Sequence, residues 1–238
     1  MLESSFSESI LKRFFRCGVI ACMTIGNPLH AVPAARALLA GGIDVIELTL
    51  RTPKSMESLR RITAEVPEIL AGVGTILTPQ QVEESIVAGG HFGVAPGLSE
   101  RVVKTAQDKG LPFAPGIATP SELEQGLELG CREMKFFPAE PSGGVSFMKS
   151  IYAPYAHLGV QFLPLGGINI RNMGDYLRET ATLAVGGSWI VTSDLLQTEN
   201  WAAITDAART ASTLVKEIRQ DNVQPAGSNN FFPQRRMS

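Results

Sequence analysis

The sequence is poor in the residues that bind metals and form disulfides. It has three cysteines and three histidines among 238 residues. They are Cys17, Cys22 and Cys131, and His30, His91 and His157. No cysteines form a CxxC pair, and neither residue type has the spacing of zinc ligands. We therefore predict reduced, mostly buried thiols, surface or packing histidines, and no metal site.

Net charge is small, and long apolar runs are absent. The 21 Lys and Arg residues nearly balance the 23 Asp and Glu residues, so nothing favours nucleic acid or an anionic membrane. No apolar run approaches the ~20 residues that span a bilayer. The opening MLESSFSESILKRFF lacks the apolar core of a signal peptide. We expect a cytoplasmic protein with neither partner.

The sequence does have enough apolar material for one core. Its 238 residues, 44% of them hydrophobic, suit one domain. Short apolar runs predict eight strands: Gly18–Met23, Asp44–Leu50, Leu70–Thr75, Phe92–Ala95, Pro112–Ala114, Glu133–Pro138, Gln161–Pro164 and Leu183–Gly186. Amphipathic segments between them predict helices, among them Pro28–Leu39, Thr78–Ala88 and Thr119–Leu129. This alternation predicts parallel pairing in an α/β fold, a (β/α)8 TIM barrel of roughly 250 residues.

The two ends differ from this pattern. Residues 1–17 predict an extra amphipathic helix, over Ser4–Phe15, that covers the barrel bottom. The barrel is expected over residues 18–218, ending with a helix at Glu199–Ile218. Residues 219–238 are polar and predict a disordered tail, although Phe231 and Phe232 interrupt that pattern.

Glycines and prolines cluster just after the predicted strands. They include Gly72, Gly74, Pro96, Gly97, Pro115, Gly116, Pro138, Gly166, Gly167, Gly186 and Gly187. The repeat length also suits a solenoid, so period alone does not decide the fold. In a barrel, tight turns at this end surround the C-terminal face, where active sites lie.

The second strand carries charge on one face. In DVIELTLRT, Ile46, Leu48 and Leu50 share one face, and Glu47, Thr49 and Arg51 share the other. In a barrel the second face points to the interior and its upper rim. Glu47 and Arg51 form either a structural ion pair or part of a site.

The sixth strand places a lysine inside the barrel. In EMKFFPAE, Met134 and Phe136 suit packing under helices, so Lys135 points inward. Desolvation lowers the pKa of a lysine and frees its amine as a nucleophile. A lysine beside Glu47 is what imine chemistry requires. The alternative is a lysine that reaches the rim or neutralises Glu47.

Two paired glycines end the last two strands. They stand in LPLGGI and in VGGSW. Loops after strands seven and eight of such barrels often bind phosphate through backbone N–H groups, which glycine leaves accessible. Gly166, Gly167, Gly187 and the hydroxyl of Ser188 therefore form a candidate phosphate site.

The motifs together resemble the 2-keto-3-deoxy-6-phosphogluconate (KDPG/KHG) aldolase family, from about Gly18 to Leu196. The matching blocks are HAVPAARALLAGG, IELTLRT, AGVGTILTPQQ, APGLSE, PFAPGIATPSEL, EMKFFPAE, GGINI and GGSWIV. The resemblance implies a metal-free class I aldolase with no cofactor, generally a homotrimer. It implies Lys135 as the Schiff-base lysine, Glu47 as the acid/base, and Arg51 and Thr75 as ligands of the pyruvate carboxylate. Gly166, Gly167 and Ser188 match the phosphate region, and Pro96 lies in the matching block APGLSE.

Two departures bear on specificity. The family commonly has Ser where this chain has Ala95, and Thr where it has Leu165. We therefore expect KDPG cleavage to pyruvate and glyceraldehyde 3-phosphate, with 4-hydroxy-2-oxoglutarate as a further candidate substrate and altered selectivity. The alternatives are a sugar-phosphate isomerase or decarboxylase with Lys135 as a simple cation, and a phosphosugar-binding protein without catalysis.

Overall fold

The computed structural model describes residues 4–221. The strands are β1 (Val19–Met23), β2 (Val45–Thr49), β3 (Leu70–Gly74), β4 (Phe92–Val94), β5 (Phe113–Ala114), β6 (Gly116–Ile117), β7 (Glu133–Phe136), β8 (Gln161–Pro164) and β9 (Val185–Gly187). The α-helices are α1 (Glu8–Cys17), α2 (Ala31–Ala40), α3 (Ser55–Glu65), α4 (Pro79–Val87), α5 (Glu100–Asp108), α6 (Pro120–Glu128), α7 (Gly144–Tyr152), α8 (Met173–Leu177), α9 (Ser193–Gln197) and α10 (Trp201–Asp221). Two 3-10 helices, η1 (Pro28–His30) and η2 (Ala153–Leu158), precede α2 and follow α7.

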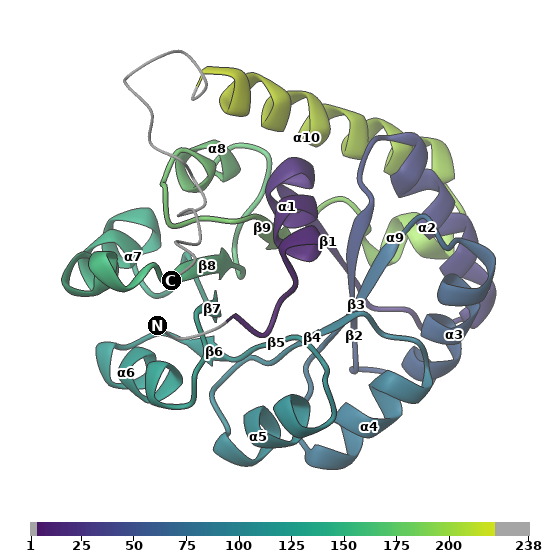
Figure 1. Cartoon of the computed structure of the whole chain (residues 1–238). Helices are drawn as coiled ribbons and strands as arrows, with labels where there is room; N and C mark the ends of the chain where they lie inside the picture. The colour runs from purple at the N-terminus through teal and green to yellow at the C-terminus, as the bar shows by residue number, and fades with distance from the viewer. Residues whose placement is uncertain (1–3, 222–238) are drawn as a thin grey trace.

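The strands pair in parallel throughout the described chain. A six-stranded sheet has the order β5-β4-β3-β2-β1-β9, and a three-stranded sheet has the order β6-β7-β8. An isolated parallel bridge joins Leu165, just after β8, to Gly186 in β9. The strands lie at the centre and most of the helices surround them (Figure 1). This is the parallel α/β architecture predicted from the alternation of strands and helices.

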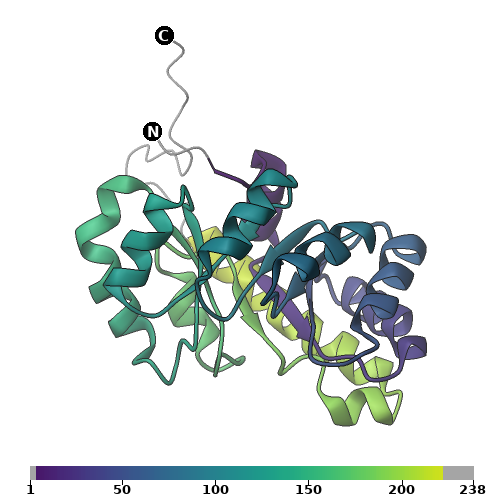
Figure 2. The same ribbon diagram turned by 90° about the horizontal axis from the view of Figure 1, so that it is seen from below.

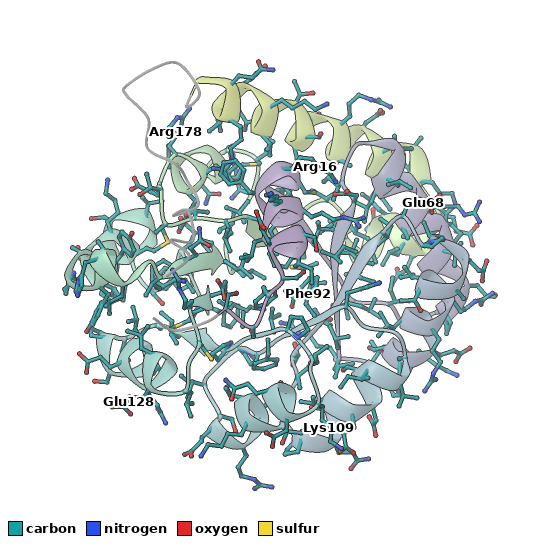
Figure 3. All side chains as sticks on the ribbon, viewed as in Figure 1. Arg16, Glu68, Phe92, Lys109, Glu128 and Arg178 are labelled. Carbon is teal, nitrogen blue, oxygen red and sulfur yellow. The ribbon has the colours of Figure 1, made fainter. Side chains whose placement is uncertain are left out.

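Side-chain alternation decides what fills the core. Ile46 and Leu48 of β2 are fully buried, as expected for the face that packs under helices. In Figure 3 the labelled Phe92 lies within the ring, while the labelled charged residues Glu68, Lys109 and Glu128 lie at its periphery. The apolar core thus surrounds an interior into which the other strand face points.

Two helices begin with a capping box, in which a threonine and a residue three positions later cap each other. The Thr78 hydroxyl accepts from the backbone N–H of Gln81, whose side chain in turn accepts from the Thr78 N–H. Thr119 and Glu122 form the same reciprocal pair. Each satisfies two N–H groups that the first turn of a helix leaves without partners, and so fixes where α4 and α6 start.

Several predicted boundaries are wrong by a few residues, for local physical reasons. The first helix begins at Glu8, not Ser4, because the Ser7 side chain caps it, and it continues to Cys17. The fifth predicted strand, Pro112–Ala114, begins one residue later, at Phe113, and a short strand that was not predicted, β6, follows after Pro115, which has no N–H to donate to a ladder. The eighth predicted strand begins at Val185, not Leu183.

The C-terminal boundary is also wrong. Helix α10 continues three residues past Ile218, to Asp221. The remainder of the predicted disordered tail, including Phe231 and Phe232, lies outside the described residues. Within residues 4–221, no helix combines the length and apolar character needed to cross a membrane.

Helix α1 lies across the N-terminal ends of the strands (Figures 1 and 2). Its Phe14 ring is fully buried and contacts Phe92, at the start of β4, edge-on with 4.9 Å between centroids. Just before the helix, the Ser4 hydroxyl donates to the carboxylate of Glu133, the first residue of β7, at 2.8 Å. The opposite, C-terminal ends of the strands are left to their glycine-rich loops.

Candidate active site

Lys135 and Glu47 meet inside the ring of strands. The Lys135 Nζ lies 3.1 Å from Glu47 Oε1 and 3.3 Å from Oε2, with the two residues 5% and 2% exposed. Strands β7 and β2 neighbour each other in neither sheet, so the contact crosses the interior. Burying two charges is costly unless they pair closely, and this geometry meets that condition.

Two glycines make room for this pair. A methyl group on Gly74, in β3, would lie 1.8 Å from Glu47 Oε1 and 2.4 Å from its carboxyl carbon. On β6, Gly116 pairs in register with Lys135, and a methyl group there would lie 2.3 Å from the Pro96 carbonyl. Hydrogen in place of Cβ therefore gives the Glu47 carboxylate its room and lets Pro96 approach the strand beside Lys135.

A thiol and an aromatic ring complete the immediate surroundings. The Cys22 Sγ, on β1, donates to Glu47 Oε2 at 3.6 Å. Burial raises the pKa of Cys22 well above its usual value, and the charge of Glu47 adds to that effect, so the thiol keeps its proton. The ring centroid of Phe137 lies 5.3 Å from Lys135 Nζ. One carboxylate and one aromatic face thus adjoin the amine.

The two residues expected to hold a carboxylate lie at neighbouring strand ends. Arg51 is exposed just past β2, and Thr75 is half-buried just past β3 with a left-handed backbone at φ 63°. The backbone N–H of Leu50 donates to the Gly74 carbonyl at 2.9 Å, which holds these ends together. Among the described residues, neither side chain forms a hydrogen bond or ion pair with Lys135. The rim therefore presents a guanidinium and a hydroxyl above the pair.

The glycine loops lie beside each other at the same end of the strands. Gly166 and Gly167 follow β8 with φ of 97° and 81°, a conformation that favours glycine. Gly187 ends β9, and Ser188 follows it, exposed to solvent. The N–H of Gly166 faces Gly186 through the bridge at Leu165. Within residues 4–221, the backbone N–H groups of Gly167 and Ser188 form no hydrogen bond with a protein acceptor. Such N–H groups are available to an anion.

Leu165 is one of the two residues that depart from the pattern of the family that the sequence resembles. It is buried, and a methyl group on Gly186 would lie 2.4 Å from its Cγ. The leucine side chain therefore covers Gly186 between β8 and β9, next to the glycine loops. Ala95, the other departure, is buried directly after β4.

The donor set is unsuited to a metal ion. In the part of the chain that the structure describes, no three His, Cys, Asp or Glu side chains are grouped to hold one. The three cysteines are buried and free. What the site offers is a buried amine paired with one carboxylate, below a cationic rim, and that combination is typical of an enzyme that forms an imine with a keto acid.

Comparison with known proteins agrees with this class. The family model described as KDPG and KHG aldolase matches residues 9–207. The 2-dehydro-3-deoxy-phosphogluconate aldolase of Dickeya dadantii is 45% identical over 81% of this chain and 90% of its own length. The KHG/KDPG aldolase of Escherichia coli is 44% identical with the same coverage. The chain belongs to the KDPG and KHG aldolase family.

A solved structure adds a chemical finding about a relative. The KDPG aldolase of Legionella pneumophila, captured with pyruvate as a covalent carbinolamine intermediate at low pH, has a TM-score of 0.81 and 37% identity to this chain. The match covers 84% of this chain and 97% of that one. A thiamine phosphate pyrophosphorylase from Pyrococcus furiosus, at 16% identity and a TM-score of 0.63, shares the fold alone.

Sequence reasoning missed three residues next to the pair. Cys22 stands in VIACM, an apolar strand with no polar face to reveal it. The clustering of glycines after the strands predicts Gly74 only as a turn residue, whereas it adjoins the Glu47 carboxylate. Phe137 shares its strand face with Lys135, and that spacing was a signal that could have placed it at the site.

Proposed function

We propose that this protein is a class I aldolase that cleaves 2-keto-3-deoxy-6-phosphogluconate to pyruvate and glyceraldehyde 3-phosphate through an imine on Lys135. The observation that carries the proposal is the buried contact of 3.1 Å between Lys135 Nζ and Glu47 Oε1. A carboxylate at that distance can take the proton that the ammonium must lose before it becomes a nucleophile. The names of the relatives support the choice of substrate.

The reaction follows from these two groups. The neutral amine adds to the C2 ketone, and Glu47 moves the protons that convert the hydroxyl of the adduct to water, leaving a cationic imine. Glu47 then takes the C4 hydroxyl proton as the C3–C4 bond breaks. The bonding pair enters the imine and gives an enamine, and the aldehyde leaves. Protonation at C3 and hydrolysis release pyruvate and the free amine.

Binding groups are assigned by their place around this centre. Arg51, with Thr75, holds the carboxylate of the keto acid, because a guanidinium bonds a carboxylate through two parallel N–H groups. Pro96 lines the pocket beside Gly116. The N–H groups of Gly167 and Ser188 hold the phosphate, and Gly166 and Gly187 give their loops room. We assign no metal and no cofactor, since the imine supplies the electron sink.

Residues 18–218 act as one barrel domain in this proposal. The bridge from Leu165 to Gly186 and the continuity of β5 with β6 through Pro115 support closure of the two sheets into a (β/α)8 barrel. Helix α1 covers its bottom as an added N-terminal element. We propose a cytoplasmic homotrimer, which light scattering of the purified protein tests.

The experiment is a pyruvate-release assay with KDPG and with 4-hydroxy-2-oxoglutarate. Turnover of KDPG is expected, undiminished by EDTA and lost in Lys135→Arg, which keeps the positive charge without a nucleophilic amine. The second substrate is a candidate because the E. coli relative is called a KHG/KDPG aldolase. Turnover that survives in Lys135→Arg would indicate a simple cationic role. No turnover of either substrate would indicate a binding protein.

A further inference from the structure

A carboxylate lies next to the proposed phosphate site. Glu140, four residues past β7, has an exposed position. Its backbone N–H donates to the Gly166 carbonyl at 3.0 Å, and that of Ala139 donates to the Leu165 carbonyl at 2.7 Å. The loop after β7 is thus fastened along the loop after β8. A phosphate bound at Gly166 and Gly167 would have a negative side chain as its neighbour.

The Glu140 carboxylate points away from the N–H group of Gly167. Its stem covers Gly167, where a methyl group would lie 2.6 Å from Glu140 Cβ. Its head points to Gly144 and Tyr176: a methyl group on Gly144 would lie 3.4 Å from Glu140 Oε1 and 3.7 Å from the Tyr176 hydroxyl. The direction of the carboxylate is therefore set at its far end.

Tyr176 sets that direction. The residue is fully buried on α8, and its hydroxyl donates to Glu140 Oε1. Burial raises the pKa of Tyr176, and the hydrogen bond with Glu140 raises it further, so the hydroxyl remains a donor. On the opposite side of the loop, the Asn172 side-chain amide donates to the Gly167 carbonyl at 3.2 Å. The carbonyls of Gly166 and Gly167 thus accept hydrogen bonds from the Glu140 N–H and the Asn172 amide, respectively.

We infer that Tyr176 is a positioning residue for substrate phosphate: its hydroxyl keeps the Glu140 carboxylate away from the N–H group of Gly167. A free carboxylate would accept from that N–H group itself and would repel a phosphate dianion. The inference rests on the proposed function and adds the means by which that site distinguishes a phosphorylated from an unphosphorylated substrate.

Tyr176→Phe tests the inference because it removes only the hydroxyl. The KM for KDPG should rise about threefold to tenfold with kcat nearly unchanged, the size of effect that follows loss of one hydrogen bond. The KM for 4-hydroxy-2-oxoglutarate, which has no phosphate, should stay the same. A matched control is Tyr155→Phe, since the Tyr155 hydroxyl also donates to a glutamate, Glu124, at 2.7 Å, in a solvent-exposed hydrogen bond. It should change neither KM.

A second variant separates charge from structure. In Tyr176→Phe/Glu140→Gln the freed side chain is neutral, so the KM for KDPG should return to within about twofold of the wild type. Glu140→Gln alone should not raise this KM, because its amide oxygen still accepts from Tyr176. Inhibition by inorganic phosphate should weaken in Tyr176→Phe and recover in the double variant.

Three results would overturn the inference. They are an equal rise of both KM values in Tyr176→Phe, a double variant no better than Tyr176→Phe, and a raised KM for KDPG in Glu140→Gln, which tests the point even if Tyr176→Phe does not fold. Failure of the proposed function looks different. In that case the wild type itself would not release pyruvate from either substrate.

Discussion

Lys135 and Glu47 owe their meeting to side-chain alternation on two distant strands. Each has hydrophobic neighbours in sequence that face outward, so its own side chain has nowhere to point except the interior. A charged pair there stabilises the fold less than apolar packing of the same volume would. That Lys135 and Glu47 are nevertheless buried, at 5% and 2% exposure, fits a pair of groups that take part in the reaction.

Arg51 is the first residue whose role can be measured separately. It lies exposed on the same face of β2 as Glu47, beyond the strand end. Arg51→Lys keeps the charge and loses the fork geometry, so the KM for pyruvate in the condensation direction should rise by about tenfold or more, since a hydrogen bond to a charged group contributes roughly 1.5–3 kcal/mol. Steady-state kinetics measures it, with the exposed Arg101→Lys as control. An unchanged KM would mean that the carboxylate is held by other residues.

Leu165 is the second residue whose role can be measured separately, because it stands where the family commonly has a threonine hydroxyl. A leucine over Gly186 cannot donate to a substrate hydroxyl, which costs roughly 0.5–1.5 kcal/mol for a neutral hydrogen bond. We predict relaxed selection between the two C4 epimers of the phosphorylated substrate, and about threefold to tenfold sharper selection in Leu165→Thr. The ratio of kcat/KM for the two epimers measures this. Wild-type discrimination above about a hundredfold would exclude Leu165 as the cause.

The sequence predicted Glu47 and Lys135 because polar residues on an otherwise apolar strand reveal the inward face. It could not predict Cys22, since both faces of β1 are apolar in composition, nor the Tyr176–Glu140 hydrogen bond, which joins residues 36 positions apart. Contacts of that kind depend on how α8 packs against the loop after β7, and local periodicity holds no information about it.

At the scale of elements, β3 shows how a strand makes room for a side chain on its neighbour. Thr49 and Gly74 pair in register on β2 and β3, so Gly74 lies directly beside the upper part of the Glu47 side chain. The boundaries of the predicted strands were right to within about two residues, but the additional strand β6, just after Pro115, was not predicted. Pro115 has no N–H and so interrupts the ladder, although its carbonyl still accepts a hydrogen bond from the backbone N–H of Lys135 at 2.8 Å.

Gly74→Ala should therefore damage catalysis more than folding. The new methyl group would displace the Glu47 carboxylate from Lys135, and a misplacement of about 1 Å can cost roughly a hundredfold in rate. The measurement is kcat for KDPG cleavage together with the thermal midpoint. Gly26→Ala is the control, because no atom lies within 4 Å of its new methyl group. If the kcat of Gly74→Ala were within about threefold of the wild-type value, catalysis would not require the observed position of Glu47.

At the scale of the whole molecule, the two ends of the parallel strands differ. The C-terminal ends carry the proposed site, and the N-terminal ends are covered by α1 and the segment before it. Glu133 lies at the covered end, 3% exposed, where it accepts a hydrogen bond from Ser4. Burial raises the pKa of Glu133, against smaller opposing effects of Ser4 and Arg132. Stability should therefore depend on the protonation of a residue that lies at the N-terminal end of β7, two positions before Lys135.

The sign of that dependence follows from the raised pKa. The folded state favours protonated Glu133, so this stabilisation is complete below the unfolded pKa of about 4.3 and is lost as pH rises through the higher folded value. Relative to Glu133→Gln, the wild type should lose about 1.4 kcal/mol of unfolding free energy for each unit of pKa elevation. Urea titrations from pH 4 to 8 measure this, with exposed Glu128→Gln as control. A pH-independent difference would contradict it.

The imine on Lys135 is the central claim, and covalent trapping tests it most directly. The protein is incubated with pyruvate and sodium borohydride, which reduces an imine to a stable secondary amine, and is then digested and analysed by mass spectrometry. We predict one adduct on the peptide that contains Lys135, absent without pyruvate and absent in Lys135→Ala. No adduct in the wild type, or an adduct that persists on another lysine in Lys135→Ala, would contradict the account.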